Sequence, residues 1–100
     1  GPTALSAVRT INIDKAFVGV HGIDPARGLT ANNGEDAAVN QAMMDQAHKT
    51  IALADHSKFG KVAKFLICPA SRIDLLITDT GANTATTAPF RDMGIEVRRV

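Results

Sequence analysis

The sequence predicts an α/β fold, with a mainly parallel, Rossmann-like sheet and flanking helices. Short apolar runs that suit strands alternate along the chain with segments of helical spacing, which is the pattern of strand–helix–strand units. Some of these runs are apolar throughout, as expected of parallel strands that are covered on both faces. The 100 residues, 45% of them hydrophobic, exclude a disordered chain and suffice for one domain with a modest core.

The first part of the chain predicts a helix, a strand and a loop. Residues 3–9 place their apolar side chains on one face of a short helix. Residues 16–20 form an apolar run and predict a buried strand. Residues 22–33 predict a loop, because glycine, proline and asparagine turn signals recur through them.

A longer helix is predicted over residues 35–49. Asn33 is a candidate N-cap, and Glu35 suits the positive N-terminal end of the helix dipole. His48 and Lys49 suit the negative end. The apolar stripe expected to face the core consists of Ala38, Val39, Ala42, Met43 and Ala47.

Three further strands and one ambiguous run follow. Residues 51–55, 75–78 and 95–100 predict strands of the same sheet. Residues 64–68 are apolar enough for another strand, but the connection before them is too short for a helical crossover. We therefore expect this strand at an edge or in an antiparallel pair.

Two helical segments complete the predicted elements. Residues 69–73 predict a single helical turn. Residues 84–93 predict a helix that is interrupted near Pro89, because proline is tolerated only at a helix start. Gly94 is expected to end this helix as a C-terminal cap.

Charge and cysteine content exclude several classes of protein. Eleven basic against ten acidic residues give a net charge of +1, which argues against a nucleic-acid-binding surface on this segment. The single cysteine, Cys68, cannot form a disulfide within the chain and predicts a small buried hydrophobe. Neither a membrane-spanning apolar stretch nor a signal peptide occurs, so we expect a cytoplasmic protein without a membrane partner.

Motifs for cofactors and metals are absent. The sequence holds no Walker loop, dinucleotide glycine fingerprint or nucleophile elbow. His21, His48 and His56 show no metal-binding spacing with one another. We therefore expect neither a cofactor nor a metal ion.

Residues 54–60 follow the apolar run of residues 51–53, at the carboxyl end of a predicted strand, and are the strongest candidate for a binding site. Ligands of open α/β sheets bind at the carboxyl ends of strands. Lys58 could hold a phosphate or carboxylate there, with Asp55 and Ser57 beside it. The alternative is a solvated Lys58 that follows Ser57 as the cap of a short helix.

Other candidates follow the first strand and the loop. His21 and Asp24 come after the first predicted strand and could face the same cleft; alternatively, His21 is structural and Asp24 begins a turn. Glu35 could accept hydrogen bonds from a polyol or act as a base, or could simply complement the helix dipole. Asp79 ends another strand, where it is either a site residue or part of an ordinary turn.

Several of these segments together resemble the sensor domain of DeoR-type transcriptional regulators. The resemblance covers nearly the whole chain and is carried by residues 14–25, 28–30, 35–39, 53–60 and 74–79. It implies a regulator, commonly a repressor, with an N-terminal DNA-binding domain and a C-terminal sensor for a phosphorylated sugar or polyol. Residues 1–100 would be the C-terminal part of that sensor, an incomplete domain without the module that binds operator DNA, and the whole regulator would be a homo-oligomer.

The fold of that family is similar to those of ribose-5-phosphate isomerase and the coenzyme A transferases. The resemblance implies that the isomerase's second acid, glutamate and strand-end motif are kept as Asp24, Glu35, and Asp55, Ser57 and Lys58. His21 replaces the first acid, and no lysine lies between Asp24 and Glu35. The implied reading is a binding cleft without catalysis. The ligand-binding residues expected from the residues and the resemblance together are His21, Asp24, Gly28, Thr30, Glu35, Asp55, Ser57 and Lys58.

Three functions remain open from the sequence. The first is the effector-binding domain of a regulator, which is not an enzyme. The second is a fragment of a sugar-phosphate isomerase with Glu35 as general base. The third is a segment that serves mainly in oligomerisation.

Overall fold

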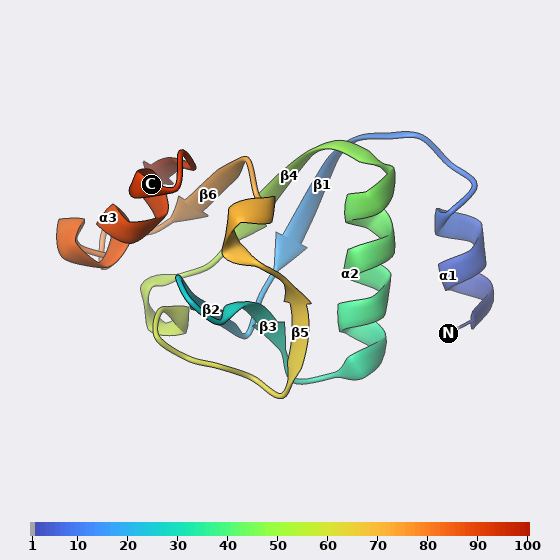
Figure 1. Ribbon diagram of the computed structural model, residues 1–100, viewed down its shortest axis with the longest axis horizontal. Coiled ribbons are helices and arrows are strands. Elements are labelled where there is room, and N and C mark those ends of the chain that lie inside the picture. Colours follow the sequence, from blue (N-terminus) through green and yellow to red (C-terminus); the bar gives the residue numbers. More distant parts are fainter. Residues whose placement is uncertain (1) are drawn as a thin grey trace.

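The computed structural model describes residues 2–100 (Figure 1). The larger of its two sheets has four parallel strands. The strand order is β1-β4-β6-β7, and every neighbouring pair is parallel. The strands are β1 (Ile13–Gly19), β4 (Ala47–Leu53), β6 (Leu75–Thr78) and β7 (Glu96–Arg99). The predicted α/β fold with a mainly parallel sheet is therefore confirmed.

A second, antiparallel sheet has the order β2-β3-β5 and was not predicted. It consists of β2 (Gly22–Asp24), β3 (Gly28–Ala31) and β5 (Phe65–Cys68). The antiparallel pairing of β5 agrees with the expectation for residues 64–68. The loop predicted over residues 22–33 is wrong, since most of it is the β2–β3 hairpin.

The hairpin escaped prediction because its strands are very short and its turn signals dominate the pattern. Asp24 Oδ2 accepts hydrogen bonds from the backbone N–H groups of Ala26 and Arg27, which closes the turn. Gly28 then adopts a positive φ of 84°, where a side chain would be strained. A Cβ at Gly28 would lie 2.3 Å from the carbonyl oxygen of Cys68, so glycine also permits the close approach of β5.

The helices are α1 (Pro2–Val8), α2 (Gly34–Gln46) and α3 (Thr84–Asp92), with 3-10 turns η1 (His56–Lys58) and η2 (Ala70–Arg72). Helix α2 begins as predicted, because Asn33 Oδ1 accepts the N–H groups of Glu35 and Asp36. It ends before the predicted residue 49. His48 and Lys49 lie in β4, because residues from Ala47 onward pair with β1. Sheet pairing thus overrides the local helical pattern.

The face that α2 buries also differs from the predicted stripe. Ala37, Ala42 and Met44 are buried, whereas the other four residues of the stripe are only partly covered. Apolar residues, which include Val39, Met43 and Met44 as well as the alanines, lie on most sides of this helix, so its buried face is poorly defined in the sequence.

Helix α3 is not interrupted at Pro89, contrary to prediction. Proline removes the hydrogen bond to the carbonyl of Ala85, which is exposed and so open to water. The next residue, Phe90, is fully buried and packs edge to face on Phe59, with ring centroids 5.6 Å apart. Gly94 has a φ of 84° and follows the helix as the predicted cap.

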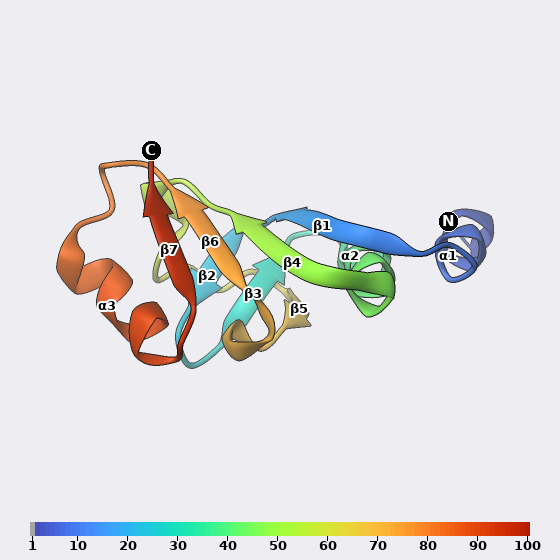
Figure 2. The same cartoon turned by 90° about the horizontal axis from the view of Figure 1, so that it is seen from above.

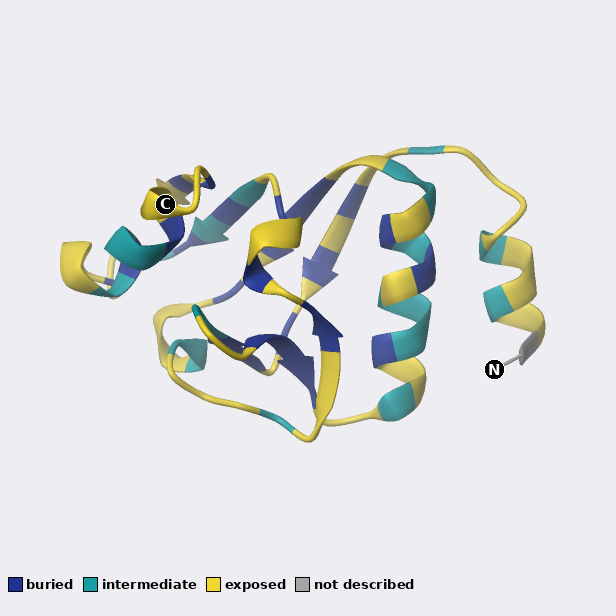
Figure 3. Ribbon diagram, in the orientation of Figure 1, coloured by how far each residue is buried: buried dark blue, intermediate teal, exposed yellow. Residues whose placement is uncertain are grey.

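The elements form layers on one side of the parallel sheet. Figure 2 shows α2, α3 and the antiparallel sheet on the same side of the four parallel strands, within residues 2–100. The core lies between these layers (Figure 3) and includes Val18, Leu29, Ile67, Leu76 and Phe90. The predicted burial of Cys68 is confirmed, and burial raises the pKa of its thiol to about 11.

The other face of the parallel sheet is open among the described residues. Phe17 and Leu53 are 55% and 41% exposed on it, while Val18 and Ala52 beside them are fully buried on the opposite face. No helix in residues 2–100 has the length and apolar character needed to cross a membrane.

Candidate functional site

Two strand ends that the sequence singled out lie together at the carboxyl edge of the parallel sheet. His21 follows the end of β1. Lys58 is the last residue of η1, which follows β4. A backbone hydrogen bond of 2.9 Å from Gly60 N to Ile23 O fastens the second segment to β2. Ligands of parallel sheets bind at this edge, so it is the place to search for a site.

His21 and Lys58 line one hollow of about 350 Å³, which we call the basic hollow. Its remaining lining residues are Asn32, Lys61, Val62 and Ala63. Two ammonium groups at one hollow favour an anion, because each offers three donors and a positive charge. Sequence reasoning found Lys58 and missed Lys61, whose only signal was its position three residues further on.

The segment that carries Lys61 is held by Thr30 and Gly22. Thr30 Oγ1 accepts the N–H of Ala63 at 2.8 Å. A Cβ at Gly22 would lie 2.3 Å from the carbonyl oxygen of Lys61, so only glycine allows the two backbones this close. Thr30 is buried and is not among the residues that line the hollow.

Asp55 and Ser57 organise the turn that presents Lys58. Asp55 Oδ1 accepts both the backbone N–H and the hydroxyl of Ser57, so Asp55, not the expected Ser57, caps the short helix η1. These hydrogen bonds, with smaller contributions from the charges of Lys58 and His56, lower the pKa of Asp55. Lys58 Nζ lies 3.8 Å from Asp55 Oδ2, a loose pair that leaves the ammonium able to meet a ligand.

His21 is fixed by the segment before α2. Its backbone N–H donates to Thr30 O, and its Nδ1 accepts the N–H of Asn32 at 3.0 Å. An imidazole that accepts through Nδ1 carries its proton on Nε2, which is then a donor. The ring itself is exposed.

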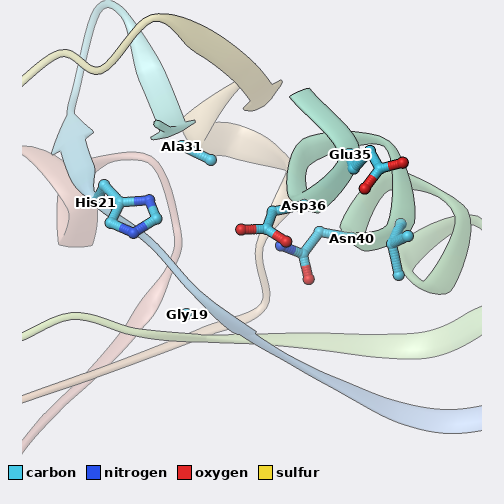
Figure 4. A pocket seen from close by; sticks show the side chains of 7 residues that line it. Gly19, His21, Ala31, Glu35, Asp36 and Asn40 are labelled. Carbon is cyan, nitrogen blue, oxygen red and sulfur yellow. The ribbon is translucent and has the colours of Figure 1, made fainter. Parts of the chain in front are cut away.

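His21 also lines a second hollow of about 260 Å³, which we call the acidic hollow. Figure 4 shows the polar ends of Asp36 and Asn40 directed from α2 toward His21, whereas the Glu35 carboxylate points away from it in this view. The other lining residues are Gly19, Ala31, Glu35 and Val39. Neither Asp36 nor Asn40 was predicted as a site residue, although their spacing of four places them on one helical face.

Five of the eight predicted site residues line neither hollow. Asp24, in its turn, borders a separate hollow of about 320 Å³ that includes Phe59 and Phe90. Gly28 packs against β5. The structure thus brings His21 together with Lys58 in the basic hollow and with Glu35 in the acidic hollow. The other predicted site residues line neither hollow: Asp24, Gly28, Thr30, Asp55 and Ser57.

Asp79, at the end of β6, fastens the neighbouring strand end. Its carboxylate accepts the backbone N–H of His56 at 2.7 Å and lies 2.6 Å from the imidazole Nδ1. The side-chain hydrogen bond from His56 is the main reason why the pKa of Asp79 is lowered. No group of three histidine, cysteine or acidic side chains suited to a metal ion occurs in residues 2–100.

Comparison with known proteins gives the family. The DeoR C terminal sensor domain matches residues 1–80. The HTH-type transcriptional repressor GlcR of Bacillus subtilis is 37% identical over 97% of this chain and 37% of its own length. GlpR of Haloferax volcanii and GolR of Listeria innocua, both named HTH-type transcriptional regulators, are each 32% identical over 97% and 98% of this chain.

The chain spans only 37 to 39% of the length of these relatives. The matched family is described as a sensor, and the relatives are named as transcription regulators or repressors, which favours a regulator's sensor over the isomerase alternative. The chain therefore belongs to the DeoR C-terminal sensor domain family.

Proposed function

We propose that this chain binds a phosphorylated sugar or polyol as the effector of a longer transcription regulator. The observation that carries the proposal is the pairing of Lys58 and Lys61 with His21 around one hollow at the carboxyl edge of the sheet. A phosphate offers three acceptor oxygens and a charge near −2, which two ammonium groups and an imidazole N–H match.

The proposal that the effector controls DNA binding rests on thermodynamic linkage between the two binding events. An effector changes DNA affinity only if it binds one arrangement of the regulator better than another. We propose that a DNA-binding domain outside this chain contacts operator DNA in the cytoplasm, and that the regulator is a repressor. A homo-oligomer would let it read two half-sites. The names of the relatives support a DNA-binding domain, and the name of GlcR supports repression.

The test is isothermal titration calorimetry on the complete regulator with sugar phosphates and the matching unphosphorylated sugars. We expect only the phosphorylated compounds to bind measurably. Lys58→Ala should weaken binding about 10- to 100-fold, because a hydrogen bond to a charged group contributes about 1.5–3 kcal/mol.

Lys49→Ala is the matched control, since it removes the same charge from the amino-terminal half of β4. The proposal fails if sugars with and without phosphate bind alike, or if Lys58→Ala and Lys49→Ala have the same effect. Release of operator DNA by the same compounds, followed by fluorescence anisotropy, tests the regulatory part separately.

A further inference from the structure

We propose that the effector lies across His21, with its phosphate in the basic hollow and its hydroxyl groups on Asp36 and Asn40 in the acidic hollow. The inference rests on the proposed function and adds the direction in which the ligand binds. It also names two residues that select the ligand, neither of which was predicted from the sequence as a site residue.

The volumes of the two hollows, and the His21 that they share, favour one ligand that occupies both. Small-molecule sites usually measure roughly 300–1,000 Å³. The acidic hollow, at about 260 Å³, falls below that range, and the basic hollow, at about 350 Å³, lies near its lower end. Because His21 lines both hollows, one elongated ligand can occupy the two together.

The two hollows carry different polar groups, and these groups set the direction in which the ligand binds. Lys58 and Lys61 supply only donors and positive charge at one end. Asp36 supplies a carboxylate and Asn40 supplies an amide at the other end (Figure 4). Hydroxyl groups both donate and accept, so they can donate to the carboxylate and accept from the amide. A molecule with one phosphate and a row of hydroxyls matches both ends.

The side chains of the acidic hollow are held in place by the structure around them. Asp36 and Asn40 are one helical turn apart on α2, whose first turn is fixed by the Asn33 cap. The residue before the cap, Asn32, donates its N–H to His21 Nδ1 at 3.0 Å. The imidazole and the helix that carries Asp36 are thus joined by one short stretch of backbone. Sites whose groups are held in this way select ligands well.

The polarity also predicts what the site rejects. A second phosphate on the far end of the sugar would meet the Asp36 carboxylate, and like charges repel. The site should therefore prefer a sugar monophosphate to the bisphosphate of the same sugar. Replacing Asp36 with a cation should reverse that preference.

The experiment compares fructose 6-phosphate, sorbitol 6-phosphate, ribose 5-phosphate, fructose 1,6-bisphosphate and inorganic phosphate by calorimetry on the complete regulator. For the monophosphate that binds best, Asp36→Ala should lower affinity about 10- to 100-fold, and Asn40→Ala should lower it about 3- to 10-fold. Inorganic phosphate, which needs only the basic hollow, should bind both variants as it binds the unchanged protein. Asp36→Lys should raise affinity for the bisphosphate relative to the monophosphate.

Asp92→Asn removes a carboxylate from the exposed end of α3 and serves as the control for charge. Thermal melting of each variant controls for the loss of an acidic residue near the N-terminus of α2. The inference is overturned if monophosphates bind in a Lys58-dependent way but the Asp36 and Asn40 variants bind them normally; the proposed function then stands. If neither the monophosphates nor inorganic phosphate depends on Lys58, the proposed function falls as well.

Discussion

The imidazole Nδ1 of His21 accepts the backbone N–H of Asn32 at 3.0 Å, which joins the end of β1 to the start of α2. This bond helps to orient the ring of His21, which lines both the basic and the acidic hollow. Neither residue is buried, so the contact is part of the surface that a ligand would meet.

Replacing His21 with leucine should expose the Asn32 amide to solvent exchange. The substitution removes the acceptor, and loss of a single hydrogen bond costs about 0.5–1.5 kcal/mol of stability. Amide hydrogen exchange at Asn32 measures the effect directly. His21→Asn, whose side-chain oxygen can take the place of Nδ1, should restore part of the protection; unchanged exchange in the leucine variant would contradict the bond.

The hydrogen-bonded carboxylate of Asp79 should stabilise the folded protein less as the pH falls into the acid range. Hydrogen bonding from the His56 side chain lowers the pKa of Asp79 from its ordinary value of 3.8. Its contribution to stability is therefore fully present above pH 3.8 and is lost as the pH falls through the lower pKa of the folded protein. The difference in unfolding free energy between the protein and Asp79→Asn should shrink in that range.

Urea unfolding at a series of pH values measures this difference. The pKa of Asp55 is lowered too, so acid will destabilise both proteins, and only their difference reports on Asp79. A difference that grows as the pH falls below 3.8 would refute the assignment.

Alanine substitutions at Gly28 and Gly60 should distinguish backbone strain from a steric clash with a neighbouring strand. Gly28 and Gly60 have φ values of 84° and 81°, but a Cβ would strike the Cys68 carbonyl oxygen only at Gly28. Gly60→Ala should cost about 1–2 kcal/mol from the left-handed conformation alone. Gly28→Ala should cost clearly more, as measured by urea unfolding, because β5 would also have to move away. Equal losses would show that the hairpin and β5 do not approach as described.

Two phenylalanines test the arrangement of layers. Phe90 is fully buried, so Phe90→Ala should destabilise the chain by about 3–5 kcal/mol. Phe17 is 55% exposed on the open face of the sheet, and Phe17→Ala should cost much less. Thermal or urea unfolding of the 100-residue chain measures both. A loss at Phe17 as large as that at Phe90 would mean that this face is covered.

The sequence predicted the parallel sheet because β6 and the carboxyl-terminal parts of β1 and β4 are apolar runs that alternate with recognisable helical segments. Asn33 and Gly94 mark helix ends by local chemistry, and both predictions are confirmed. The early end of α2 at Gln46 depends on the pairing of β4 with β1, which lies far away in the sequence. The β2–β3 hairpin pairs neighbouring segments, but its strands are so short that the turn signals dominate the pattern.

The candidate site, like the fold, was predicted only in part from the sequence. Lys58 follows a strand end, and that position alone pointed to the edge where it lies with His21. Asp36 and Asn40 needed the structure, since only the packing of α2 beside the end of β1 turns their face toward His21. Asp24 could be read as a ligand residue or as a turn, and its hydrogen bonds to Ala26 and Arg27 show the turn.

A crystal structure of the complete regulator with a bound sugar monophosphate tests the central claim most directly, through the distance from the phosphorus atom to Lys58 Nζ. We predict that the phosphate lies within hydrogen-bonding reach of Lys58 and Lys61 and that the sugar hydroxyls extend past His21 to Asp36. A sugar phosphate bound instead in the hollow between Asp24 and Phe90, or on the open face beside Phe17, would contradict this account.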